Sequence, residues 1–253
     1  TSSGSSLNAS LRDIKLKVVY VNLDRPLYKL LSWRDEIRKV TDLKGRGIAV
    51  ASRGDTMEGA ANLMLRKHGL DPVRDVIWVA LGTDGRATSL VAKAVDSAVL
   101  GFADSHRLLT RNFPVHEVSN IGREIKMLYT GLATTEELVV KRPDLVRRFI
   151  RATVKGRELL RRNKAQALAL GKKYDRSPDD VRQADYDATL ELMTADGMEE
   201  LETQKSDIEI AKRMLAIQKD FAPEQIFDFR FVRDAYKELR ELGWERALKG
   251  GSK

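Results

Sequence analysis

An apolar run that ends in a small polar loop and continues as a helix is the feature that most limits what this chain can fold into. Ile48–Ala51 is apolar and predicts a buried strand, and Gly45 and Gly47 supply a turn before it. The polar loop Ser52–Thr56 follows at once, and apolar residues then recur at helical spacing as far as Leu65. This stretch therefore predicts a strand, a tight loop and a helix start, in that order.

The same order of elements recurs twice further along the chain. Val76–Ala80 and Val95–Leu100 are predicted strands, and each is followed by a loop with glycine and aspartate and then by a helical pattern. Strands that alternate with helices through short loops predict parallel βαβ units. Open α/β sheets bind ligands at the carboxyl ends of their strands. We therefore expect three loops at one edge of a sheet: Ser52–Thr56, Gly82–Arg86 and Gly101–Ser105.

These loops contain most of the candidate ligand-binding residues. A helix start collects unpaired backbone N–H groups and the positive end of the helix dipole, which suits an anionic or strongly accepting group. Asp55 and Asp104 would repel an anion unless Arg53 or Arg86 offsets them, so they favour a ligand with amino, amidine or hydroxyl groups, or a zwitterion. Thr83 and Arg86 have a second interpretation, as a helix N-cap and an exposed first-turn residue. The loop candidates are Ser52, Gly54, Asp55, Thr56, Thr83, Arg86 and Asp104.

Composition excludes several classes of chemistry. The 253 residues contain no cysteine, which excludes disulfides, thiolate metal sites and cysteine nucleophiles. There is no run of about 18 apolar residues, so no membrane-spanning helix is predicted. The net charge of +8 would suit a nucleic-acid binder, but basic and acidic residues are mixed along the predicted helices, as in Arg157-Glu158. This mixture indicates a solvated surface.

The sequence contains no pattern that indicates catalysis or metal binding. Of the three histidines, His68 lies at a predicted helix end, where a cation suits the helix dipole. His106 follows Asp104 and Ser105, but a catalytic triad is defined by geometry in space and neighbours in sequence rarely form one. No residues have metal-ligand spacing, and no phosphate-binding fingerprint follows a strand. We predict no catalytic residue, no metal and no cofactor.

Five short motifs stand in a fixed order along the chain. They are Asp42-Leu43-Lys44-Gly45, Gly69-Leu70-Asp71-Pro72, Ala94-Val95-Asp96-Ser97-Ala98-Val99, Gly131-Leu132-Ala133-Thr134 and Arg142-Pro143-Asp144-Leu145-Val146-Arg147-Arg148-Phe149. In this order they resemble the solute-binding proteins of ABC importers for sulfonates, taurine, nitrate and the pyrimidine precursor of thiamine. The resemblance covers the chain from Thr1 to about Tyr174 and is poor beyond it. In that family the first loop grips the polar end of the ligand, which here falls on Ser52, Gly54 and Thr56.

The resemblance implies an α/β fold of the type II periplasmic-binding-protein kind, in which two βαβ lobes are joined by a hinge and the C-terminal part is helical. Residues 1–41 would form part of lobe one, residues 42–119 lobe two, and residues 120–253 the return crossing and the helical remainder of lobe one. The family's first strand–helix–strand–helix has no counterpart here. On this basis Ser3 lies in a cleft loop before a helix that begins at Leu7, Asn22–Asp35 is loop-like, and Tyr129 lines the hinge or packs in the core.

The function that the resemblance implies is the extracytoplasmic capture of a small polar solute by hinge closure, with no bond made or broken. The solute would be a sulfonate, an amine, a pyrimidine or a related compound. The expected partners are this solute and an ABC permease in the membrane, with no nucleic acid and a monomeric chain, located in the periplasm or at the outer face of the cytoplasmic membrane. Two alternatives stay open on the same fold: a thiamine-pyrimidine-synthase-like enzyme, for which His106 is the candidate, and a ligand-sensing domain of a regulator.

Overall fold

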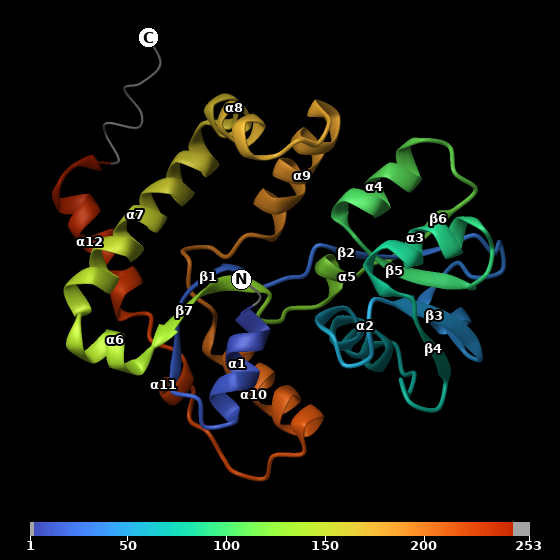
Figure 1. The fold of residues 1–253 in the computed structure, drawn as a ribbon, viewed down its shortest axis with the longest axis horizontal. Coiled ribbons are helices and arrows are strands. Elements are labelled where there is room, and N and C mark those ends of the chain that lie inside the picture. Colours follow the sequence, from blue (N-terminus) through green and yellow to red (C-terminus); the bar gives the residue numbers. More distant parts are fainter. Residues whose placement is uncertain (1–2, 245–253) are drawn as a thin grey trace. The chain divides into compact units, whose positions relative to one another are not determined.

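A computed structural model describes residues 3–244, which form two compact units (Figure 1). Within these residues, unit 1 comprises residues 3–24, 127–186 and 193–244, and unit 2 comprises residues 25–126 and 187–192. The chain crosses between the units at Asp24–Arg25 and returns at Lys126–Met127, where the sequence predicted boundaries after residues 41 and 119. No helix in residues 3–244 combines the length and the apolar character that a membrane span requires. The sequence also predicts a disordered tail over Lys249–Lys253, and this segment lies outside the described residues.

Unit 2 is built on a five-stranded sheet in the order β4-β3-β5-β2-β6. β3 (Arg46–Val50) is parallel to both β4 (Val76–Ala80) and β5 (Ser97–Gly101), as the βαβ pattern predicts. β2 (Tyr28–Ser32) is antiparallel to β5 on one side and to β6 (His116–Asn120) on the other. The parallel strands therefore form one half of the sheet, and their carboxyl ends share an edge.

The prediction of a loop across Asn22–Asp35 is wrong where β2 lies. Leu30 and Leu31 at the centre of this strand are fully buried, because β2 has a neighbour on each side and is covered on both faces. A strand buried on both faces lacks the alternation of apolar and polar residues that identifies a half-exposed strand. The Arg25-Pro26 pair just before it favoured the interpretation as a turn.

Each parallel strand of unit 2 is followed by a helix. α2 (Thr56–Lys67) follows β3, α3 (Gly82–Val91) follows β4, and α4 (Phe102–Thr110) follows β5. The sequence placed the start of α3 at Arg86, but the helix begins at Gly82, which adopts a φ of +70° that favours glycine. The short elements of unit 2 are the 3-10 turn Val40–Leu43 and α5 (Ile121–Glu124).

Unit 1 contains a two-stranded antiparallel sheet of β1 (Leu16–Leu23) and β7 (Thr130–Thr135). The second edge of β1 is bonded to segments that are distant in sequence. The amide of Val21 donates to the carbonyl of Gly197 at 2.9 Å, and the amide of Asp228 donates to the carbonyl of Val18 at 2.9 Å. These bonds satisfy backbone groups that an edge strand would otherwise leave unpaired.

The helices of unit 1 pack on this sheet and on one another. They are α1 (Ser3–Leu11), α6 (Glu136–Lys141), α7 (Pro143–Arg162), α8 (Lys164–Tyr174), α9 (Asp179–Leu192, which ends in unit 2), α10 (Leu201–Leu215), α11 (Pro223–Ile226) and α12 (Arg230–Glu241). α1 packs against α10, and α7 lies beside α12 (Figure 1). Pro143 is the first residue of α7, where its missing N–H is not needed. α1 begins at Ser3, before the predicted start at Leu7, so the prediction of a loop is wrong for residues 3–6.

A cluster of carboxyl groups is buried in unit 1. Asp207 of α10 is 6% exposed, and its Oδ2 accepts from the amide of Leu128 at 2.6 Å. Glu199 and Asp24 are also buried, and Glu199 hydrogen-bonds to Asp207. Burial raises the pKa of Asp207 to about 7, with the nearby charge of Asp24 acting in the same direction. Asp207 is therefore protonated in the folded unit over a pH range in which it would be ionised in the unfolded chain.

This raised pKa predicts that the protein loses stability as the pH rises towards 7. Below pH 4 Asp207 is protonated in both the folded and the unfolded state. Between pH 4 and 7 the folded state binds more protons than the unfolded state, so the free energy of unfolding falls as the pH rises. Asp207→Asn keeps the shape and the acceptor for Leu128 but removes the ionisation. We expect the variant to be more stable than the wild type at pH 8 by on the order of 3 kcal/mol and about equal at pH 4.

Urea unfolding at a series of pH values measures this difference. Asp84→Asn is the matched control, because it makes the same substitution at an exposed aspartate outside the buried cluster. An Asp207→Asn variant that follows the wild-type curve at every pH would contradict the assignment.

Gly122 of α5 is a position where unit 2 has no room for a side chain. A β-carbon there would lie 2.2 Å from the carbonyl oxygen of Pro26 and 2.7 Å from a methyl carbon of Leu192. We expect Gly122→Ala to destabilise the protein by about 1–3 kcal/mol in urea unfolding, because backbone must move. Gly59→Ala in α2 is the control: nothing lies within 4 Å, so it should be neutral or stabilising. Equal effects of the two substitutions would argue against the close packing of Gly122.

Candidate functional site

Three helix N-termini gather at one edge of the unit 2 sheet. β4, β3 and β5 are adjacent and parallel, and each leads into a helix, so the starts of α2, α3 and α4 lie along the shared carboxyl edge. The amide of Leu81 donates to Val50 and that of Gly82 to Ala51, both at 3.0 Å, which holds the first two connections together. α3 and α4 have no side-chain N-cap bond. The three predicted loops thus share one edge, with backbone donors at it.

The first loop is wound tightly around its own side chains. Asp55 is the N-cap of α2: its Oδ1 accepts from the amide of Glu58 at 2.8 Å, and its Oδ2 accepts from the amide of Ser52 at 3.0 Å. Gly54 adopts a φ of +77°, and Ser52 and Gly54 are exposed. Both carboxylate oxygens of Asp55 are therefore hydrogen-bonded within the loop. The sequence alone predicts a free negative charge at this position.

Glu58, the third residue of α2, is bonded to this loop and was not among the residues predicted from the sequence. It is 6% exposed, it pairs with Arg53 through two bonds of 3.0 Å, and its Oε2 accepts from the amide of Gly54 at 2.6 Å. Arg53 thus compensates Glu58 and is not paired with Asp55. The spacing Asp55-x-x-Glu58 is that of a capping box, so the signal was present in the sequence.

Arg86 of α3 contacts β5, α2 and the start of its own helix. Its Nη1 donates to the carbonyl of Val99 in β5 at 2.6 Å and lies 2.6 Å from the sulfur of Met57 in α2. Its Nε and Nη2 donate to the carbonyls of Gly82 and Thr83 at 3.2 and 3.3 Å. The side chain is 2% exposed, so the interpretation as an exposed first-turn residue is wrong.

The charge of Arg86 has no carboxylate partner in the described part of the chain. All of its bonds go to neutral carbonyls and a sulfur, although a buried cation usually pairs with an anion. The carboxyl edge of the unit 2 sheet at Arg86 therefore carries an uncompensated positive charge, in addition to the positive ends of the helix dipoles.

The other loop candidates lie at the starts of the same helices. Thr56 is the first residue of α2 and is half-buried, and Thr83 is the second residue of α3 and is exposed. The N-cap of α3 is Leu81, so Thr83 is not the cap. Asp104 lies in the first turn of α4 and pairs with Arg107 at 3.0 Å. Thr56, Thr83 and Asp104 thus each belong to a different helix start on one sheet edge.

The two remaining candidates belong to unit 1. Ser3 opens α1, and Tyr129 is half-buried directly before β7, where its amide donates to Leu23 at 3.2 Å. Their participation in a site with the unit 2 residues stays a prediction.

His106, the candidate for an enzymatic role, has no relay beside it in the described structure. Its ring stacks on Phe102 with the centroids 5.5 Å apart. The hydroxyl of Ser105 donates to the carbonyl of Phe102, and Asp104 pairs with Arg107. The neighbouring serine and aspartate are therefore engaged elsewhere, as expected from their adjacency in sequence. Within residues 3–244 no group of three or more histidine or carboxylate side chains is arranged to hold a metal ion.

Solved structures of low sequence identity share this fold. The periplasmic sulfonate-binding protein SsuA from Methylobacillus flagellatus KT has a TM-score of 0.77 at 18% identity, over 92% of this chain and 72% of that one. The aliphatic sulphonate-binding protein SsuA from Escherichia coli has a TM-score of 0.74 at 18% identity, over 89% and 73%. The desulfurization enzyme DSZB has a TM-score of 0.63 at 16% identity, over 93% and 83%. A comparison with curated protein sequences finds no match.

The fold is therefore the α/β fold of type II periplasmic solute-binding proteins, as the sequence resemblance implied. The chain belongs to the NMT1/THI5-like family, whose model matches residues 1–167. The structures with the higher TM-scores are binding proteins, and an enzyme shares the fold.

The role of Asp55 as a helix cap leads to a stability prediction. We expect Asp55→Ala to lower the free energy of unfolding by about 1 kcal/mol, because the amides of Glu58 and Ser52 lose their acceptor. Asp84→Ala, in the first turn of α3 but without a capping bond, should cost less than half of this. Chemical denaturation of the two variants measures the difference, and equal losses would show that the cap does not stabilise α2.

Proposed function

We propose that this protein is the solute-binding component of an ABC importer and that its solute has an oxyanion group, such as a sulfonate, which binds at the carboxyl edge of the unit 2 sheet. The observation that carries the proposal is the convergence of three helix N-termini above the buried guanidinium of Arg86. Backbone donors and helix dipoles stabilise negative charge at such an edge, and Arg86 adds a fixed charge that water screens little.

The carboxylates at this edge do not repel an anion, although the sequence alone predicts that Asp55 and Asp104 would. Asp55 accepts two backbone N–H groups, Glu58 pairs with Arg53, and Asp104 pairs with Arg107. Their charges are offset within their own loops, whereas that of Arg86 is not. The balance of charge therefore favours an anionic group over an amine. The sulfonate-binding names of the two SsuA structures agree with this preference.

The hydroxyls of Thr56 and Thr83 complete the proposed contact with the oxyanion, together with the hydroxyl of the exposed Ser52. Capture would be reversible, with the solute favouring a closed arrangement of the two units through its additional contacts, and Ser3 and Tyr129 are the candidates in unit 1. Delivery to a membrane permease places the protein in the periplasm or at the outer face of the cytoplasmic membrane. The protein acts as a monomer and catalyses no reaction.

Three probes that carry the same butyl chain and differ in their head group test the polarity of the solute. We expect butane-1-sulfonate to raise the melting temperature in a thermal-shift assay and butylamine to leave it unchanged, with pentanoate between them. A ligand that binds only the folded state at about 100 times its Kd adds about 2.7 kcal/mol of stability. Stabilisation by the amine alone would contradict an oxyanion site.

Thr56→Val tests the position of the site without changing the side chain's shape. We expect the apparent Kd for butane-1-sulfonate to rise about tenfold, which corresponds to one lost hydrogen bond to a charged group. Thr88→Val is the matched control. Thr88 also lies in a helix of unit 2, α3, but its hydroxyl donates to the carbonyl of Asp84 within that helix. Equal affinities for Thr56→Val and the wild type would remove α2 from the site.

A further inference from the structure

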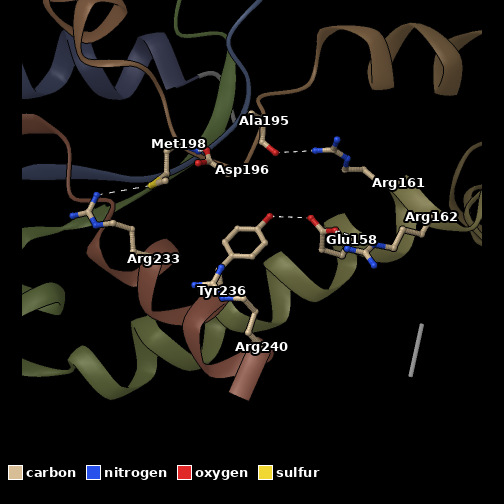
Figure 2. Close-up of a pocket in the computed structure, with 9 residues that line it drawn as sticks. All are labelled: Glu158, Arg161, Arg162, Ala195, Asp196, Met198, Arg233, Tyr236 and Arg240. Carbon is tan, nitrogen blue, oxygen red and sulfur yellow. Dashed lines mark hydrogen bonds and ion pairs between the residues drawn. The ribbon is translucent and has the colours of Figure 1, made fainter. Parts of the chain in front are cut away.

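Unit 1 contains a polar hollow of ≈ 770 Å³ that includes none of the predicted solute-binding residues (Figure 2). Its walls come from the last turns of α7, from one face of α12 and from the segment between α9 and α10. The residues are Glu158, Arg161, Arg162, Ala195, Asp196, Met198, Arg233, Tyr236 and Arg240. The volume lies in the range of pockets that hold small molecules.

The wall between α9 and α10 is held in place by buried bonds. The hydroxyl of Thr194 donates to the carbonyl of Val21 at 2.7 Å and accepts from the amide of Gly197 at 3.1 Å. Arg157, which is 4% exposed, donates to the carbonyl of Thr194. The segment is thus fixed to both β1 and α7, so the hollow is preformed and costs little ordering on binding.

The opposite walls present guanidinium groups from two helices. Arg161 and Arg162 follow each other on α7, and Arg233 and Arg240 stand two turns apart on α12, on the face that also carries Tyr236. Figure 2 shows the hydroxyl of Tyr236 bonded to Glu158, at 2.9 Å, between these two pairs. The four arginines exceed the two acids, Glu158 and Asp196, by two charges.

Three of the four arginines have no carboxylate partner among the described residues. Arg162 pairs with Glu158, at 3.1 Å. Arg161 donates to the carbonyl of Ala195 at 2.8 Å, and Arg233 lies 3.9 Å from the sulfur of Met198. The side chain of Arg240 has no hydrogen bond or ion pair with residues 3–244. Guanidinium groups left with open donors are suited to bidentate contact with an oxyanion.

The lining also distinguishes this hollow from a surface that packs against protein. A second hollow of unit 1, of ≈ 380 Å³, is lined by apolar side chains such as Leu132, Phe149 and Leu160. In the first hollow only Ala195 and Met198 are apolar, so an apolar helix or strand would leave the three unpaired arginines without water or an anionic partner. A small, highly charged ligand fits this lining better than a polypeptide does.

We infer that this hollow is a second binding site, for a small soluble compound with at least two oxyanion groups of the phosphoryl kind. One group would contact Arg233 and the other would contact Arg240, with Arg161 as a further contact and Arg162 held in place by Glu158. Arg233 and Arg240 lie seven residues apart on one helix, about 10.5 Å along its axis, so a single monoanion cannot satisfy both ends of the cluster.

Calorimetric titration with pyrophosphate tests the site at constant ionic strength set with chloride. We expect pyrophosphate to bind the wild type at least tenfold more tightly than inorganic phosphate. The double variant R233Q/R240Q should weaken pyrophosphate binding at least tenfold with an unchanged circular dichroism spectrum. The control R66Q/R176Q removes the same charge from two exposed arginines outside the hollow, and it should bind within twofold of the wild type.

Three results would overturn the inference. Equal weakening in both double variants would show only the effect of net charge. Loss of pyrophosphate binding in Thr56→Val, with R233Q/R240Q unaffected, would place the anion at the unit 2 edge. Sedimentation with phosphatidylglycerol vesicles in the absence of pyrophosphate binding would indicate a lipid headgroup instead of a soluble compound.

Discussion

The buried guanidinium of Arg86 is the interaction on which the unit 2 edge depends. One side chain reaches β5 through Val99, α2 through Met57 and the start of α3 through Gly82 and Thr83, so it fixes three connections relative to each other. Carbonyl acceptors satisfy its hydrogen bonds without neutralising its charge. Arg86 therefore determines both the geometry of the edge and the sign of its charge, and a substitution at this position would change both.

Sequence periodicity was sufficient for the parallel half of the sheet. β3, β4 and β5 are short apolar runs between turn residues, and Pro143 marks the first turn of α7, so local signals agree with the fold there. The sequence pattern did not predict β2, because a strand between two neighbours has no polar face and because Arg25-Pro26 precedes it. Local pattern does not report which strands meet in space.

The candidate site was predictable in position but not in charge. The topology rule placed the three loops at one edge, and the structure has them there. Charge could not be read in the same way, because Asp55 and Arg86 differ in what surrounds them. Asp55 accepts two amides in its own loop, whereas Arg86 folds back beneath the helix starts. A charged residue in a loop has no fixed meaning until its partners are known, and only the Asp55-x-x-Glu58 spacing gave a local hint.

The two proposed sites rest on the same criterion, which is whether a charged side chain has a partner of opposite charge. At the unit 2 edge one arginine is buried and its charge is left to the helix starts, so a single oxyanion group is sufficient. In the hollow of unit 1 the arginines are exposed and spread over two helices, so water screens each of them and only a ligand with several charges gains from meeting them together. Burial therefore sets the number of charges that each site requires, and a monoanionic solute and a polyanion should not compete for one place on this protein.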